Sequence, residues 1–175
     1  MPSHIALRGL PIENLKRKPF RTGALDRSLT PRSFMTEEQA MLVDWLLEHA
    51  DLIPVTARGT EEISRVQIPF RSWAVTTHGA VILRPDGTPD SDWKAHMLES
   101  LSSYADRLTS MQHIITELMD ARGINAWARL NYEYEGTPVY LVMKHRDSTK
   151  LDELNAVGDE IERVFSTEGF YIHRN

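Results

Sequence analysis

Residues 20–84 alternate between strand-like and helix-like patterns, and this alternation constrains the fold more than any other feature of the chain. Apolar stretches at 20–26, 52–55 and 73–83 are separated by two segments with helical features. Parallel strands need crossover connections, which are usually helices, so the alternation favours a parallel sheet covered by helices. We therefore expect an α/β core over residues 20–88.

The two helical segments are marked by the residues that open them. Thr36 is a typical N-cap, and Gln39 three positions later completes a capping-box pattern for a helix that runs to about His49. Thr60 opens a shorter helix with two acids in its first turn, where the helix dipole favours negative charge. The segment 27–33, RSLTPRS, is expected to be a loop.

Three polar residues follow the predicted strands directly, namely Asp26, Thr56 and His78. The carboxyl ends of parallel strands lie along one edge of a sheet, where ligands bind in open α/β folds. The three side chains are therefore expected to share a site. For Asp26 an alternative stays open, because an aspartate at this place is also a common first residue of a turn.

A boundary is predicted near RPDGTPDSD, residues 84–92, which is rich in turn-forming residues. Residues 89–175 then form an α+β domain. A long helix is capped by Ser91 or Asp92 and ends at Arg122. Its apolar residues alternate steps of four and three, which fits either packing on a sheet or a helix-pairing seam. They are Met97, Leu101, Tyr104, Leu108, Met111, Ile115 and Leu118.

The rest of this domain is predicted from turn and helix patterns. A β-hairpin turns at Glu135–Gly136, an amphipathic helix follows over 148–166, and residues 169–175 form a last strand.

Composition excludes several kinds of site. The chain has 175 residues and no cysteine, so disulfides, thiolate metal sites and a cysteine nucleophile are excluded. A net charge of −5 argues against a broad nucleic-acid surface. No apolar run is long enough to span a membrane, and we expect a cytoplasmic protein. Residues 1–19 are expected to be an N-terminal arm, in which HIALRGL is a candidate extra strand.

Three segments carry a resemblance to a known family. They are DRSLT at 26–30, VTAR at 55–58 and THGAVILRPDG at 77–87. Their order, with an α+β region after them, resembles the haloacid dehalogenase-like superfamily. The similarity is to its sugar-phosphatase branch, which includes sucrose-6-phosphate phosphatase, trehalose phosphatase and the Cof-type hydrolases. The resemblance covers residues 20–175 and implies a partial Rossmannoid parallel-sheet core with an α+β cap.

The resemblance also implies a Mg²⁺-dependent phosphohydrolase. Asp26 takes the place of the nucleophile, which forms an aspartyl-phosphate, and Thr56 that of the phosphate-binding hydroxyl. Asp26 and the backbone carbonyl of Ser28 take the places of the Mg²⁺ ligands. The implied substrate is a phosphorylated small molecule such as a sugar phosphate. The implied substrate-binding residues are Thr30, Arg58 and His78.

The sequence departs from the family pattern in two places. Ser28 stands where the family has a second aspartate, which acts as general acid and base. The chain also ends at YIHRN, before the family segments that carry a lysine and an acidic pair. We therefore expect a truncated chain with low or absent activity. A second copy or a partner chain would cover the open sheet edge and supply the missing groups. The alternative is a non-catalytic relative that binds a protein or a ligand.

Overall fold

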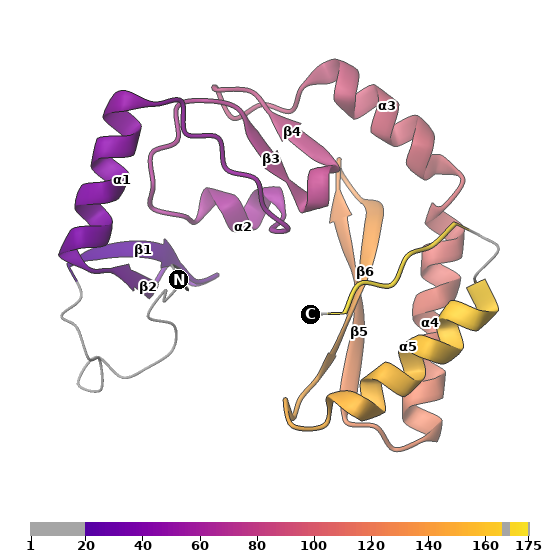
Figure 1. The fold of residues 1–175 in the computed structure, drawn as a ribbon. Coiled ribbons are helices and arrows are strands. Elements are labelled where there is room, and N and C mark those ends of the chain that lie inside the picture. Colours follow the sequence, from indigo (N-terminus) through magenta and orange to yellow (C-terminus); the bar gives the residue numbers. More distant parts are fainter. Residues whose placement is uncertain (1–19, 166–168, 175) are drawn as a thin grey trace. The chain divides into compact units, whose positions relative to one another are not determined.

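The computed structural model describes residues 20–165 and 169–174 (Figure 1). The chain divides into two compact units, Met1–Ala95 and His96–Asn175. The arm expected over residues 1–19, with its candidate strand, lies outside the described residues. The described part is a mixture of α and β structure, with two-stranded antiparallel sheets and five α-helices. None of these helices combines the length and apolar character needed to cross a membrane.

The first unit opens with an antiparallel hairpin of β1, Arg21–Leu25, and β2, Pro31–Met35. The expectation of a loop throughout 27–33 was wrong, because residues 31–33 belong to β2. Pro31 occupies the first position of the strand, where a missing N–H is tolerated. Gly23 lies at a register shift, and a Cβ there would come within 3.2 Å of Ser33 Oγ. The strand that ends before Asp26 therefore pairs with its immediate neighbour.

The helices of the first unit begin where the sequence predicts. Helix α1 spans Glu37–His49, and Thr36 and Gln39 form the expected capping box. The Gln39 N–H donates to Thr36 Oγ1 at 3.4 Å, and the Thr36 N–H donates to Gln39 Oε1 at 2.9 Å. Helix α2 spans Thr60–Ser64. The N-cap signal of α1 is local, so it was readable without knowledge of packing.

A second antiparallel hairpin consists of β3, Ala74–Thr76, and β4, Val81–Leu83. The expected turn at His78–Gly79 joins these two strands. The expected strand at 52–55 is reduced to one parallel bridge between Val55 and Val75. The described residues thus lack the parallel sheet of three strands, although this bridge has the expected direction.

Helix α3, Ser91–Ser102, and helix α4, Ala105–Ala121, replace the single long helix expected over 91–122. The Tyr104 N–H bonds to Leu101 O, one residue short of the α-helical partner. Just before the break, the Ser102 hydroxyl donates to Glu99 O at 2.6 Å, and such serine bonds compete with helical ones. The cap also differs from the two candidates: Asp90 Oδ1 accepts the Trp93 N–H at 3.0 Å.

The second unit packs two helices against one hairpin. Strands β5, Ala126–Glu133, and β6, Thr137–His145, turn at the predicted place, and helix α5 spans Leu151–Phe165. Helices α4 and α5 supply the buried core, with partly buried residues of the hairpin packed against it. The core residues are Met111, Ile115, Met119, Val157, Ile161 and Phe165. The apolar stripe of α4 therefore packs within its own unit.

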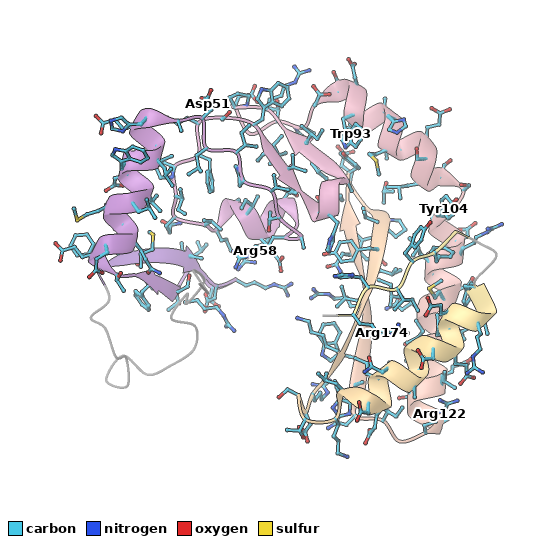
Figure 2. The ribbon with its side chains drawn as sticks, in the orientation of Figure 1. Asp51, Arg58, Trp93, Tyr104, Arg122 and Arg174 are labelled. Atoms are coloured by element: carbon cyan, nitrogen blue, oxygen red, sulfur yellow. The ribbon has the colours of Figure 1, made fainter. Side chains whose placement is uncertain are left out.

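The predicted last strand is not formed in residues 169–174; its one remaining residue, Asn175, lies outside the described part. Phe170 and Ile172 nevertheless pack against the core of α4 and α5. Arg174 pairs with Asp159 at 2.6 Å and with Glu162 at 3.2 Å (Figure 2). Side-chain contacts place this segment, and it forms no ladder with the hairpin.

Candidate functional site

Asp26 begins the turn between β1 and β2. Its Oδ1 accepts the backbone N–H of Ser28 at 2.8 Å and that of Thr30 at 2.9 Å. The Asp26 N–H in turn donates to Thr30 O at 2.9 Å. Leu29 closes the turn with a φ of 59°. This geometry matches the alternative in which Asp26 is the first residue of a turn. Its carboxylate accepts backbone N–H groups of its own loop.

Thr56 lies one residue beyond the parallel bridge. The Val75 N–H donates to Pro54 O at 2.8 Å, and the Thr56 N–H donates to Val75 O at 2.9 Å. Thr56 Oγ1 accepts the Arg58 N–H at 3.2 Å. These bonds hold the segment 54–58 against β3. Thr56 therefore follows a short parallel pairing, as the sequence pattern predicts.

The loop after β3 folds back onto the same segment. The His78 N–H donates to Thr56 O at 3.3 Å, and the Thr77 N–H donates to Arg58 O at 2.8 Å. Thr77 and His78 have φ angles of 53° and 56°, and Gly79 follows at 93°. Left-handed backbone is unfavourable for a β-branched residue such as Thr77, so the surrounding contacts must hold it.

Trp93 of α3 supplies one of these contacts. Its Nε1–H donates to Gly79 O at 3.0 Å (Figure 2). The position of Trp93 is set by Asp90, which caps α3 and pairs with Arg84 at 3.0 Å. The Trp93 N–H, and after it the Arg84 guanidinium, hold the pKa of Asp90 below its usual range. The cap of α3 is thus linked through Trp93 to the strained loop.

The predicted site residues fall into two groups. Asp26, Ser28 and Thr30 share the hairpin turn, while Thr56, Arg58 and His78 share the segment beside β3. Within the described residues no hydrogen bond or ion pair joins one group to the other. Thr56 and His78 therefore lie together, as predicted. Asp26 was predicted to lie with them, and no described hydrogen bond or ion pair joins it to them.

Sequence reasoning missed the supporting residues of the second group. Thr76 is fully buried, and among the described residues its hydroxyl has no hydrogen-bond partner. Thr77 is buried in the strained loop, and Trp93 reaches that loop from a helix 14 positions further on. The sequence did offer a signal for the two threonines, because they form a polar pair directly before the turn at His78–Gly79. No local pattern announces Trp93.

A Mg²⁺ ion at Asp26 would need six oxygen ligands in near-octahedral geometry. One carboxylate oxygen of Asp26 already accepts two N–H groups, and Ser28 turns its own N–H toward that oxygen. Among the described residues, no three His, Asp or Glu side chains gather closely enough to hold a metal ion. These residues do not fit a Mg²⁺ site.

The second group contains one cationic side chain, that of Arg58. The Arg58 side chain, labelled in Figure 2, is half-buried. Within the described residues it forms no ion pair. A guanidinium is a planar set of donors that matches phosphate or carboxylate oxygens. Comparison with known proteins adds no family: no family model matches the chain, and no curated protein matches it.

Proposed function

We propose that the protein is a relative of the haloacid dehalogenase-like sugar phosphatases that binds a phosphorylated small molecule, with low or absent hydrolysis by this chain as it stands. Thr56, Arg58 and His78 form the binding site. The observation that carries the proposal is the parallel bridge that brings segment 54–58 and residue His78 together. The proposal keeps the partial Rossmannoid core, the α+β cap and the cytoplasmic location expected from the sequence.

The chemistry of the three side chains supports a phosphoryl ligand. Arg58 brings a permanent positive charge with paired donors, and Thr56 brings a hydroxyl whose backbone is fixed on both sides. The ring of His78 adds a nitrogen that can donate a hydrogen bond to the ligand. A sugar phosphate joins such an anion to neutral hydroxyls, which agrees with a site of one cation and small polar groups.

The surroundings of Asp26 support binding more than hydrolysis. A nucleophilic carboxylate needs a free oxygen in line with phosphorus, with cations to offset the charge of the transition state. Asp26 Oδ1 already accepts the N–H groups of Ser28 and Thr30. Within the described residues Oδ2 of Asp26 accepts no hydrogen bond, so the turn itself leaves one oxygen for attack. The hydrolase alternative instead requires metal ligands and a lysine from a second copy or a partner chain.

Binding and hydrolysis are separated by two measurements on the full chain. Calorimetric titration with glucose 6-phosphate and with glucose tests whether the phosphoryl group is recognised. Arg58→Ala should weaken sugar-phosphate binding at least about tenfold, because a hydrogen bond to a charged group is worth roughly 1.5–3 kcal/mol. Arg71→Ala is the matched control, since Arg71 is an exposed arginine of the same unit outside the site.

Two outcomes would overturn the binding proposal. One is equal, weak heat with glucose 6-phosphate and glucose. The other is the same affinity in wild type and Arg58→Ala. A phosphomonoesterase assay with p-nitrophenyl phosphate, with and without Mg²⁺, addresses the alternative: turnover that needs Mg²⁺ and disappears in Asp26→Asn would support the hydrolase. Light scattering then shows whether a dimer is present to share a site.

A further inference from the structure

Helix α1 presents apolar side chains on two sides. Ala40 is fully buried on the inner side. On the other side Met41, Leu42 and Trp45 are 65%, 57% and 55% exposed. We call these three residues the outer face of α1. A helix that is apolar on both sides is normally covered on both, and a contiguous exposed apolar patch marks an interaction surface.

The outer face is extended and ordered by a stacked pair at its carboxyl end. The rings of Trp45 and His49 lie 4.9 Å apart and nearly parallel, and His49 Nδ1 lies 2.8 Å from Trp45 O. This pairing limits the rotamers of Trp45. A partner that covers the ring therefore loses less conformational entropy on docking than it would against a freely rotating side chain.

The charges around the outer face are acidic. Glu37 and Glu48 are exposed carboxylates at the two ends of α1. Asp44 is already neutralised by Arg21, with two bonds of 2.7 Å. The surface thus combines an apolar centre with an acidic rim, and its complement is an apolar segment that carries basic residues.

Residues 1–19 of the same chain have this composition. They contain the apolar run HIALRGL at 4–10 and the basic residues Arg8, Lys16, Arg17 and Lys18, against a single acid, Glu13. They join the described structure at Phe20, whose N–H donates to Met35 O at 2.9 Å. Met35 directly precedes the N-cap of α1, so Phe20 lies beside the start of this helix.

The distances allow the segment to reach the outer face. From Thr36 to Trp45 the helix rises roughly 14 Å, at about 1.5 Å per residue. The residues between HIALRGL and Phe20 span up to about 30 Å when extended. Attachment beside the helix also gives the segment a high effective concentration at this surface, which a separate molecule lacks.

We propose that residues 4–10 of this chain dock on the outer face of α1 within the same molecule, with the basic residues of 1–19 facing its acidic rim. This inference is independent of phosphoryl-group binding, because none of its residues belongs to the Thr56 site. It identifies the surface that the N-terminal arm covers: a helix face beside the hairpin of β1 and β2.

The test uses single cysteines, because the natural chain has none. Leu42→Cys places a thiol on the outer face, and Val55→Cys places one on another exposed apolar position of the same unit, 76% exposed in the native chain. The rate of reaction with dithionitrobenzoate is measured in the full-length protein. Docking predicts that Leu42→Cys reacts at least about tenfold more slowly than Val55→Cys, as local protection slows access.

The arm is then changed in the Leu42→Cys background. Ile5→Asp/Leu7→Asp introduces two charges into HIALRGL and should restore fast reaction. Ser3→Asp/Asn14→Asp adds the same charge at polar positions outside that run and should leave the protection in place. Circular dichroism is used to check that all variants keep the fold.

Three results would overturn the proposal. Leu42→Cys reacting as fast as Val55→Cys would show an uncovered face. Protection that survives Ile5→Asp/Leu7→Asp would show that another part of the protein covers it. Protection that grows with protein concentration would assign the face to a second copy. A failure of sugar-phosphate binding changes none of these readings, so the two proposals can fail separately.

Discussion

The two compact units bury their apolar side chains in different ways. In the second unit, large side chains of α4 and α5 meet each other and the β5–β6 hairpin in one connected core. In the first unit, most of the buried apolar residues have small side chains, such as Ala40, Ala74 and Ala80, and they do not belong to that core. Most of the exposed large apolar residues in the described part also belong to the first unit. Amphipathic helices occur in both units, but among the described residues only those of the second unit meet in one connected core of large side chains.

This difference teaches what holds each unit together. The second unit derives its stability from long-range apolar contacts, since its helices share one core with a two-stranded hairpin that would be marginal alone. The first unit relies more on local devices: the capping box of α1, the turn at Asp26 and the bonds of Thr56 with β3. Substitutions that remove core volume or local caps should therefore act differently in the two units.

The largest expected effect is in the core of the second unit. Ile115 is 1% exposed, and Ile115→Ala should lower the free energy of unfolding by about 2–5 kcal/mol in urea titrations. Ile114→Ala is the matched control on the same helix, because Ile114 is 40% exposed and should change stability by less than about 1 kcal/mol. Similar losses in the two variants would contradict the described core.

A smaller effect is expected at the cap of α1 in the first unit. Thr36→Ala removes the hydroxyl that accepts the Gln39 N–H and should cost about 1 kcal/mol. Thr36→Ser keeps this acceptor and should retain most of the stability. The measurement is the urea midpoint followed by far-ultraviolet circular dichroism. Equal stability of Thr36→Ala and wild type would argue that packing, and not the cap, sets the start of α1.

The smallest effect compares one local motif that occurs in both units. Asp86 accepts from the backbone and hydroxyl of Thr88, and Asp147 accepts in the same way from Thr149. In each case the threonine hydroxyl, followed by its backbone N–H, lowers the pKa of the aspartate. The turn is local, so the pKa should fall in both units despite their different cores.

The sign of the pH effect follows from these lowered pKa values. The stabilising contribution is fully present above the unfolded aspartate pKa of about 3.9 and is lost as pH falls through the folded value. Thr149→Val should raise the pKa of Asp147 toward its ordinary value and leave that of Asp86 unchanged, as followed by NMR titration of the carboxyl carbons. A joint shift of both carboxyl groups would show that the turns are coupled.

The elements that were predictable from the sequence depend on neighbours along the chain. The capping box at Thr36, the turns at His78–Gly79 and Glu135–Gly136 and the amphipathic pattern of α5 lie within a few residues of the structure they specify. Thr56 and His78 were also placed together correctly, because each follows an apolar stretch that forms the Val55–Val75 bridge.

The elements that were missed depend on contacts between distant segments. Whether Leu25 paired with a neighbouring or a remote strand was decided by the turn at Asp26 and the burial of Met35, and a strand pattern carries no record of its partner. The missing ladder at 169–174 and the contact of Trp93 with Gly79 have the same origin. The break at Tyr104 differs, because a local bond of the Ser102 hydroxyl to Glu99 O accompanies it. Local hydrogen bonding and side-chain period determined where elements begin and turn. Tertiary packing alone decided which of them pair, because burial depends on segments that the local sequence does not contain.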